Sequence, residues 1–239
     1  MDSLPQELLE EIIDHLPKRD TSASSLISRR WRRRSQQRYC ETICFFSAHR
    51  VVLWEANIPN GILSYIRHVR FIGAPRISLE PTTLGRILKP LGPRLTLTMH
   101  NVRILLPGEL TDPVSLGEFG KGVTRLVLSR ALYTPLTALV SFIFSFPNLK
   151  ELVVNDILLT SYELPPILPD AQKRGPLELL VLWKIPRSLG TDLIRRQLTS
   201  QTLCLNPRCG DMGELVFISA ESVATLILFG MRSLWISRE

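Results

Sequence analysis

Long apolar runs are missing from this sequence of 239 residues. The longest nearly apolar segment, Leu136–Phe146, is far shorter than the roughly 20 residues that a membrane-spanning helix needs. The N-terminus is acidic and lacks the basic flank and apolar core of a secretory signal. These absences predict a soluble intracellular protein, cytoplasmic or nuclear, that has no membrane partner.

Residues that usually carry catalysis or bind metal are also scarce. The four histidines show neither an H-E-x-x-H pattern nor any paired spacing, and the nucleophile pattern G-x-S-x-G does not occur. The four cysteines form two pairs, Cys40/Cys44 and Cys204/Cys209, but neither pair has the two-residue gap common in zinc modules. The sequence therefore predicts a binding protein without a catalytic residue, metal or cofactor.

The N-terminal segment 3–17, in contrast, is strongly patterned. Ser3 and Gln6 have the spacing of a capping box, and Pro17 ends the segment because the residue before a proline avoids the α region. An apolar stripe at helical spacing runs between them, formed by Leu8, Leu9, Ile12, Ile13 and Leu16. Four acids take the other side. The pattern predicts an amphipathic helix that either covers its own domain or docks on a partner.

A second segment, residues 26–33, reads Leu-Ile-Ser-Arg-Arg-Trp-Arg-Arg. Together with the opening Leu4-Pro5 it resembles the F-box, whose last helix has the family pattern Leu-Val-Cys-arginine-arginine-Trp. The resemblance covers residues 3–40. It departs from the family at Lys18–Ser25, which is short and polar where an apolar middle helix is usual, and at Ser28, which replaces the usual cysteine.

The F-box resemblance implies a module that docks on a Skp-family adaptor and, through it, on cullin. A partner enzyme then transfers ubiquitin, while this chain supplies proximity and orientation. By that resemblance nine residues divide between the adaptor-facing surface and a small internal core: Leu4, Pro5, Leu8, Ile12, Ile13, Leu16, Leu26, Ile27 and Trp31. The polar, shortened middle leaves a second interpretation open, an interaction scaffold that works without a ligase.

Positive charge is concentrated in the same region of the chain, which carries a formal net charge of +7. Residues 18–38 hold eight cationic side chains against one acid, Asp20. The densest part is a basic patch formed by Arg29, Arg30, Arg32, Arg33 and Arg34. This patch is either the solvated face of the helix that carries Trp31, or a nuclear-import or nucleic-acid site. Nucleic acid is the less favoured partner, because no aromatic residue other than Trp31 is interleaved with the arginines.

Beyond residue 60 a short apolar signature recurs, of which Leu177-x-x-Leu180-x-Leu182 is one copy. One equivalent position per copy recurs every 23 to 31 residues, at Val69, Leu95, Leu126, Leu152, Leu180, Leu203 and Leu226. This period and the L-x-x-L-x-L core resemble the leucine-rich repeat, which implies one parallel strand per repeat and a solenoid with a partner-binding face. The alternative is an irregular α/β domain whose leucine spacing is coincidental.

The predicted fold class is therefore α/β, with a small N-terminal all-α F-box module followed by a leucine-rich-repeat-like solenoid with a parallel sheet. The module spans residues 1–45, a connecting helix or linker spans 46–65, and the solenoid spans 66–239. Further helices are predicted at 135–144 and 187–198, with loops at 105–120 and 160–176. In this arrangement, which is that of F-box receptors abundant in fungi, the repeat domain binds an unidentified protein substrate.

Overall fold

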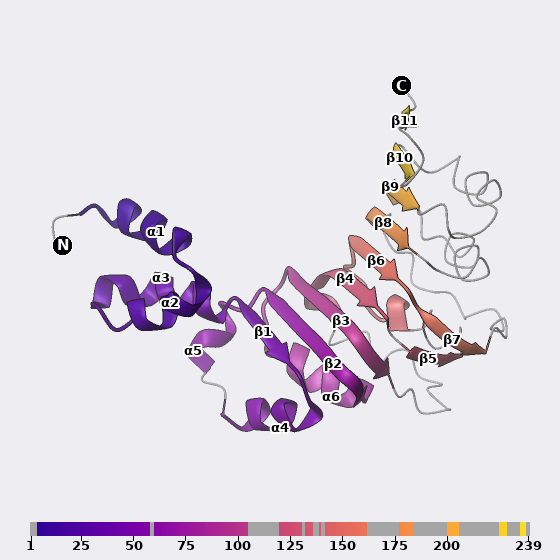
Figure 1. Cartoon of the computed structure of the whole chain (residues 1–239), viewed down its shortest axis with the longest axis horizontal. Coiled ribbons are helices and arrows are strands. Elements are labelled where there is room, and N and C mark those ends of the chain that lie inside the picture. Colours follow the sequence, from indigo (N-terminus) through magenta and orange to yellow (C-terminus); the bar gives the residue numbers. More distant parts are fainter. Residues whose placement is uncertain are drawn as a thin grey trace.

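The computed structural model describes residues 4–57, 60–104, 120–130, 132–135, 139, 142–161, 177–183, 200–205, 225–228 and 235–237. The chain begins with helices α1 (Gln6–His15), α2 (Lys18–Ser24) and α3 (Arg29–Cys40). These helices form a module that protrudes from the β1 end of a long sheet, and the strands then follow one another toward the C-terminus (Figure 1).

Helix α1 ends as its sequence predicts but begins differently. Leu16, the residue before Pro17, is extended with ψ 143°. At the other end Pro5 is the N-cap and no side chain caps the helix. Gln6 is already the first helical residue, so its side chain faces the next turn and its amide donates to Glu10 Oε1 at 3.2 Å. Ser3 lies outside the described residues.

The core of the helical module is small and partly polar. Leu9 and Ile13 of α1 are buried, and so are the hydroxyl residues Thr21, Ser24 and Ser35. The hydroxyls of Ser24 and Ser35 hydrogen-bond between α2 and α3 at 2.8 Å, and Thr21 Oγ1 donates to the Lys18 carbonyl at 2.7 Å. Each buried hydroxyl therefore has the partner that burial demands. The polar middle segment forms a helix, and its small side chains allow α2 to lie close to α3.

Helix α3 leads directly into the sheet. Only Glu41 separates it from β1 (Thr42–Phe45), and the Glu41 carbonyl accepts hydrogen bonds from the N–H groups of Arg67 at 2.8 Å and His68 at 2.9 Å. β1 pairs in parallel with β2, so the sheet begins before residue 45, where the helical module was predicted to end. The segment that follows holds α4 (Ala48–Asn57) and α5 (Asn60–Leu63).

The rest of the described chain is dominated by strands. They are β2 (His68–Leu79), β3 (Leu95–Ile104), β4 (Val123–Ser129), β5 (Leu132–Pro135), β6 (Glu151–Asn155), β7 (Leu158–Ser161), β8 (Leu177–Trp183), β9 (Ser200–Leu205), β10 (Thr225–Leu228) and β11 (Trp235–Ser237). The sheet order is β1-β2-β3-β4-β6-β8-β9-β10-β11, and β5 and β7 extend a second ladder from β3. Among the strands that the structure describes, all pairs are parallel except β10–β11. The prediction of an α/β fold with a parallel sheet is confirmed.

The strand register follows the predicted equivalent positions with one exception. Leu126, Leu152, Leu180, Leu203 and Leu226 lie side by side in one ladder across β4, β6, β8, β9 and β10. On β3, however, Leu97 takes the place that was predicted for Leu95. Both leucines are fully buried. A shift of two residues keeps the same side chains on the core face, so alternation alone could not decide between them.

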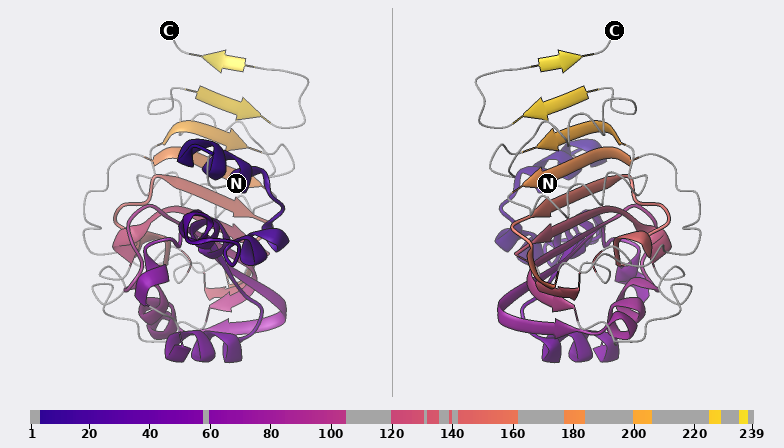
Figure 2. Two further views of the ribbon diagram at one scale, coloured as in Figure 1. Left: turned by 90° about the vertical axis from the view of Figure 1, so that its left-hand side faces the viewer. Right: turned by 90° about the vertical axis from the view of Figure 1, so that its right-hand side faces the viewer.

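The core-facing side of the sheet is covered by helical segments (Figure 2). Helix α6 (Pro81–Leu88) buries Leu84, Ile87 and Leu88 in one apolar cluster with strand residues from β1 to β8. Phe142 and Ile143 belong to the same cluster and lie in a helical segment, 142–144. Of the helix predicted at 135–144, the first residue instead ends β5. The helix predicted at 187–198, and most of both predicted loops, lie outside the described residues.

The chain turns a corner at the end of the ladder that contains Leu97, Leu126 and Leu152. Asn101 lies within β3, directly after the last residue of β3 that pairs with β4, whereas Arg130 and Asp156 directly follow β4 and β6; their φ angles are positive, at 55°, 51° and 53°. Asn101 Nδ2 donates to the Gly73 carbonyl at 2.9 Å. A Cβ atom on Gly73 would lie 2.2 Å from the Asn101 carbonyl oxygen, so only glycine fits this close backbone approach.

Candidate docking surface on the helical module

The apolar residues of α1 form two adjacent stripes with opposite surroundings. Leu9 and Ile13, four residues apart, are 1% and 0% exposed and form the inner stripe. Leu8 and Ile12, also four apart, are 47% and 41% exposed. Residues four apart lie on one helix face. The single wide stripe predicted from the sequence is therefore divided into one face that is buried in the module and one that is exposed.

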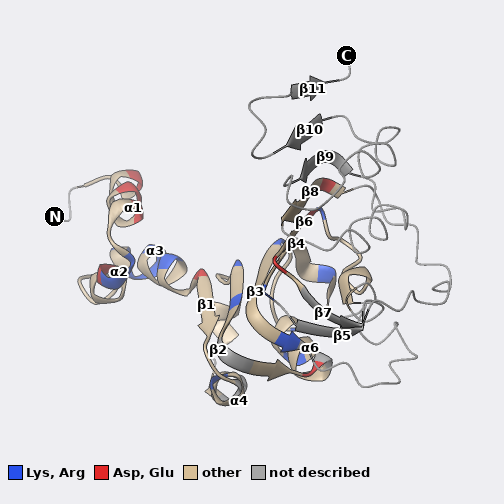
Figure 3. Cartoon of the chain, turned by 45° about the vertical axis from the view of Figure 1, so that its right-hand side comes forward, with Lys and Arg blue, Asp and Glu red and all other residues tan. Residues whose placement is uncertain are grey.

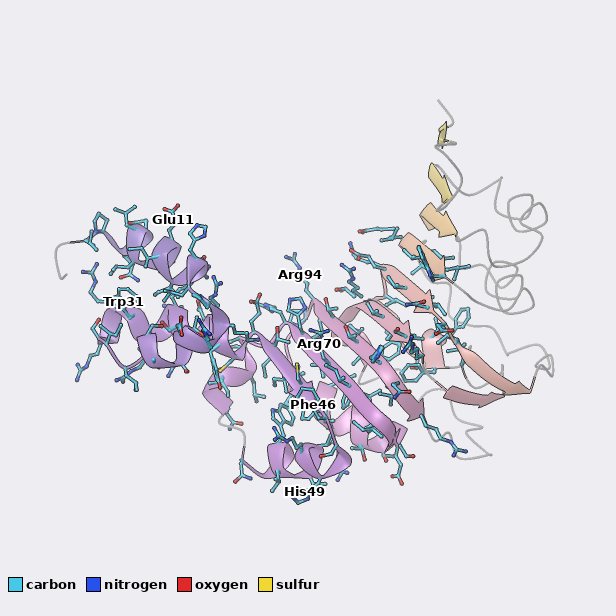
Figure 4. The ribbon with its side chains drawn as sticks, viewed as in Figure 1. Glu11, Trp31, Phe46, His49, Arg70 and Arg94 are labelled. Atoms are coloured by element: carbon cyan, nitrogen blue, oxygen red, sulfur yellow. The ribbon has the colours of Figure 1, made fainter. Side chains whose placement is uncertain are left out.

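The outer stripe continues beyond the helix at both ends. It consists of Leu4, Leu8, Ile12 and Leu16, and with Glu11 and His15 these residues line a shallow depression of about 490 Å³. Figure 4 shows Glu11 pointing away from the body of the module. An exposed apolar stripe framed by one acid and one histidine is suited to bind an apolar segment of another protein.

A second exposed apolar group lies at the turn between α2 and α3. Leu26 is 80% exposed and Ile27 is 61% exposed. Trp31 is half-buried on α3, at the end of the module that lies away from the sheet (Figure 4). Large aliphatic side chains with this exposure cost solvation free energy unless a partner covers them.

The structure thus separates the nine residues that the resemblance singled out. Ile13 lies in the interior of the module with Leu9, which was not among the nine. The other eight are at least partly accessible, and Pro5 is exposed at the start of α1. The structure adds Glu11 and His15 to this surface. Each lies three residues after a member of the outer stripe, so the helical spacing from Leu4 to Leu16 could have identified both.

The arginines of α3 do not form one basic patch. Arg30, Arg34 and Arg38 recur every four residues and face α1. Arg30 Nη2 donates to the Leu4 carbonyl at 2.6 Å, and Arg38 Nη2 donates to the Leu16 carbonyl at 2.9 Å. These two contacts hold the chain at either end of α1. Arginine can satisfy two groups at once because its donors are fixed in a planar fork.

The third arginine of this row makes the strongest contact with α1. Arg34 Nε donates to Asp14 Oδ1 at 2.9 Å, and its Nη2 donates to Asp14 Oδ2. The hydrogen bond from Arg34 lowers the pKa of the Asp14 carboxyl below its ordinary value and raises the pKa of Arg34. Asp14 is one of the four acids on the polar side of the predicted helix, and in the structure it anchors a two-arginine cluster, because Arg38 Nη1 also lies 3.7 Å from its Oδ1.

The remaining members of the predicted basic patch are solvent-exposed: Arg29, Arg32 and Arg33. They lie on the same helix as the inward-facing row, and the arginines of α3 colour part of its ribbon blue in Figure 3. The predicted patch of five is therefore divided, with Arg30 and Arg34 holding the module together. The alternation every four residues could have been read from the sequence, but the acid that the row faces could not.

Two other features of the described residues bear on chemistry. Cys40 and Cys44 are free and half-buried, and burial raises the pKa of the Cys40 thiol. Among the described residues no group of histidine, cysteine and acidic side chains could hold a metal ion, and no helix there is long and apolar enough to cross a membrane. Cys209 lies outside the described residues.

Comparison with known families agrees with the geometry of the N-terminal module. Residues 1–40 match the family model of the F-box domain. This segment ends at Cys40, the last residue of α3, so the match covers the three helices and stops before β1. A comparison with curated proteins found no match. The F-box domain indicates a Skp-binding role within a ubiquitin ligase.

Proposed function

We propose that this chain is the substrate-receptor subunit of a Skp–cullin–F-box ubiquitin ligase, of the type with a leucine-rich-repeat-like domain. The observation that carries the proposal is the outer stripe of α1, from Leu4 to Leu16, exposed on a module that matches the F-box domain. In this proposal the outer stripe docks on the Skp-family adaptor together with Leu26 and Ile27. A few large apolar side chains usually supply most of the binding energy of such an interface.

The junction between α3 and β1 supports a receptor that orients its cargo. A single residue, Glu41, connects the two elements, and its carbonyl is held by two N–H groups at the start of β2. A helix that continues into a hydrogen-bonded strand leaves little freedom between the docking module and the sheet. The adaptor would therefore hold the sheet in a fixed orientation toward the ubiquitin-carrying enzyme, and orientation is the contribution that such a non-catalytic subunit makes.

The parallel sheet is the proposed substrate-binding part. Its repeated in-register strands, with a left-handed residue at equivalent corners, support the interpretation as divergent leucine-rich repeats. Repeats of this kind expose one side chain per strand at fixed intervals, which provides an extended surface for a protein substrate.

Co-purification with a Skp-family adaptor tests the proposal. The informative variant is Leu8→Asp/Ile12→Asp, which places charge on the outer stripe without touching the buried pair Leu9 and Ile13. A matched control is Val52→Asp/Leu53→Asp on α4, where the same change affects side chains that are 59% and 48% exposed. We expect the control to bind like the wild type and the α1 variant to lose binding, with unchanged helical content in both.

Two results would contradict the proposal. Equal adaptor binding by the two double variants would mean that the outer stripe is not the docking surface. Absence of binding by well-folded wild-type protein would favour the ligase-independent scaffold. In that case the polar middle helix α2 would have disabled docking on the adaptor.

A further inference from the structure

The sheet has a second face, which lies outside the apolar core. Side chains alternate along each strand, so the neighbours of the buried ladder residues point to this open face. Along β1, β2, β3, β4, β6 and β8 the register places one open-face residue per strand in a continuous row: Cys44, Arg70, Thr98, Val127, Val153 and Val181. We call this set the open-face row. None of its members is buried, and Arg70 is exposed.

The chemistry of the open-face row changes from cationic to aliphatic along the sheet. Arg70 projects from β2 (Figure 4), and among the described residues no acid forms an ion pair with it. Its open-face neighbours differ in this respect, since His68 lies 4.0 Å from Glu41 and Arg125 lies 3.2 Å from Glu151. Arg70 is thus a cation available to a partner, whereas the Arg125 guanidinium is already paired with a carboxylate.

The other end of the row is a strip of aliphatic side chains. Val127, Val153 and Val181 are half-buried and directly adjacent across β4, β6 and β8. Leu179, also half-buried, lies two residues from Val181 on the same face. Single exposed valines are common in strands, but three in register with a leucine beside them form a continuous apolar strip that water solvates poorly.

We infer that the open-face row binds an extended segment of a partner protein that carries a carboxylate beside Arg70 and an aliphatic side chain over Val153 and Val181. This inference rests on the proposed receptor function and adds to it the chemistry of the substrate segment. The carboxylate complements the uncompensated cation, and the aliphatic side chain covers the apolar strip.

The strand spacing fixes the distance between the two recognised side chains. Neighbouring strands are about 4.8 Å apart, so Arg70 lies roughly 14 Å from Val153 and roughly 19 Å from Val181. An extended peptide advances about 3.4 Å per residue, and every second side chain points to the same side. An acid at position i therefore matches an aliphatic residue at i+4 or i+6.

The composition of the row favours a protein segment over other partners. Nucleic acid binds through several phosphate contacts with a series of cations, but the row has one cation followed by valines. An anionic membrane surface likewise selects clustered basic residues. One charge followed by an aliphatic strip suits a peptide of mixed chemistry.

A peptide array probed with the full-length chain tests the inference. Ten-residue peptides in a Gly-Ser background carry Glu, Lys or Ser at the third position and Leu or Ser at the seventh or ninth. We expect wild-type protein to bind the Glu/Leu peptides about tenfold more tightly than the Lys/Leu peptides, the difference that one desolvated charge contact of about 1.4 kcal/mol produces. Arg70→Glu should reverse this preference, and Val153→Asp should abolish the dependence on Leu.

The control is Lys89→Glu, which makes the same charge change at an exposed lysine next to α6. It should leave the selection unchanged, and adaptor binding measured in parallel should be unaffected by Arg70→Glu. Two results would contradict the inference while adaptor binding persists. Wild-type protein would show no preference for Glu and Leu in the peptides, or Arg70→Glu would keep the preference for Glu. Loss of adaptor binding with peptide selection intact would instead contradict the proposed ligase role.

Discussion

The helical module and the sheet are stabilised in different ways, although they share a covalent junction of one residue. In the module, two buried aliphatic side chains and three buried hydroxyls form the interior, and three arginines fasten α1 to α3. In the sheet, one apolar cluster continues from β1 to β8. The sheet is thus stabilised by burial of apolar surface, which is non-directional and additive, whereas the module depends on a few directional hydrogen bonds.

This difference indicates how the two parts meet their partners. The module leaves Leu8, Ile12, Leu26 and Ile27 exposed because its small interior cannot cover them. The sheet buries its large side chains and exposes a row of mixed chemistry. We expect a partner to complete the module, while the sheet is stable by itself and selects its partner by charge and shape.

The largest expected effect comes from removing a side chain from the sheet core. Phe71 is fully buried and stacks on Phe45 at a centroid distance of 5.1 Å. Phe71→Ala should lower the free energy of unfolding by about 3 to 5 kcal/mol. Urea denaturation measures the loss, and Thr98→Ala on the open face is the control, with an effect within about 0.5 kcal/mol. Similar losses in both variants would refute the assignment of the two faces.

The next effect distinguishes two neighbours on α1. Ile13→Ala opens the module core and should cost about 2 to 4 kcal/mol of unfolding free energy, seen as an early loss of helical circular dichroism. Ile12→Ala should leave helicity nearly unchanged and weaken adaptor binding instead. If Ile12→Ala destabilises the module as much as Ile13→Ala, the two stripes of α1 do not have separate roles.

A smaller effect separates the arginines of α3. Arg38→Gln removes the hydrogen bond to the Leu16 carbonyl and the charge near Asp14, at a cost of about 1 kcal/mol. Arg33→Gln is the matched control at an exposed position and should change stability by less than about 0.5 kcal/mol. Both are measured by thermal melting of the helical signal. Equal melting temperatures would show that the row facing α1 does not hold the module.

The smallest effect depends on pH. The pKa of Asp14 is lowered in the folded protein, so its ionised form stabilises the fold at pH values above the unfolded value of 3.8, and this contribution is lost as the pH falls through the folded pKa. Because both partners are more than a third exposed, the contribution is at most about 1 kcal/mol. We expect the stability difference between wild type and Asp14→Asn to be constant from neutral pH to about pH 5 and to shrink below about pH 4. A difference that grows in acid would contradict this role.

The sequence predicted the repeating elements of the molecule better than its individual contacts. The ladder of Leu126, Leu152 and Leu180 follows from alternation and period, because every strand must bury the same face. Alternation does not determine the two-residue shift on β3, and the short strand β1 has too few residues to show a period.

The apolar stripe of α1 was predicted, but the division of its residues between inside and outside was not. Helical spacing identified the apolar residues of α1, but Leu8 and Leu9 are equivalent in the sequence until α3 defines which side is covered. In the same way, Arg33 and Arg34 are chemically identical neighbours, and only the position of Asp14 makes one of them structural. Which face of a helix is buried depends on its tertiary neighbours, which a periodic pattern does not contain.

Hydroxyl-radical footprinting of the chain with and without a Skp-family adaptor tests the central claim most directly, since it reports the exposure of single side chains. Docking through the outer stripe predicts that the adaptor shields Leu8, Ile12, Leu26 and Ile27 and leaves Val127, Val153 and Val181 as reactive as in the free chain. Shielding of the three valines, with unchanged reactivity on α1, would contradict the account, because the adaptor would then occupy the face assigned to the substrate.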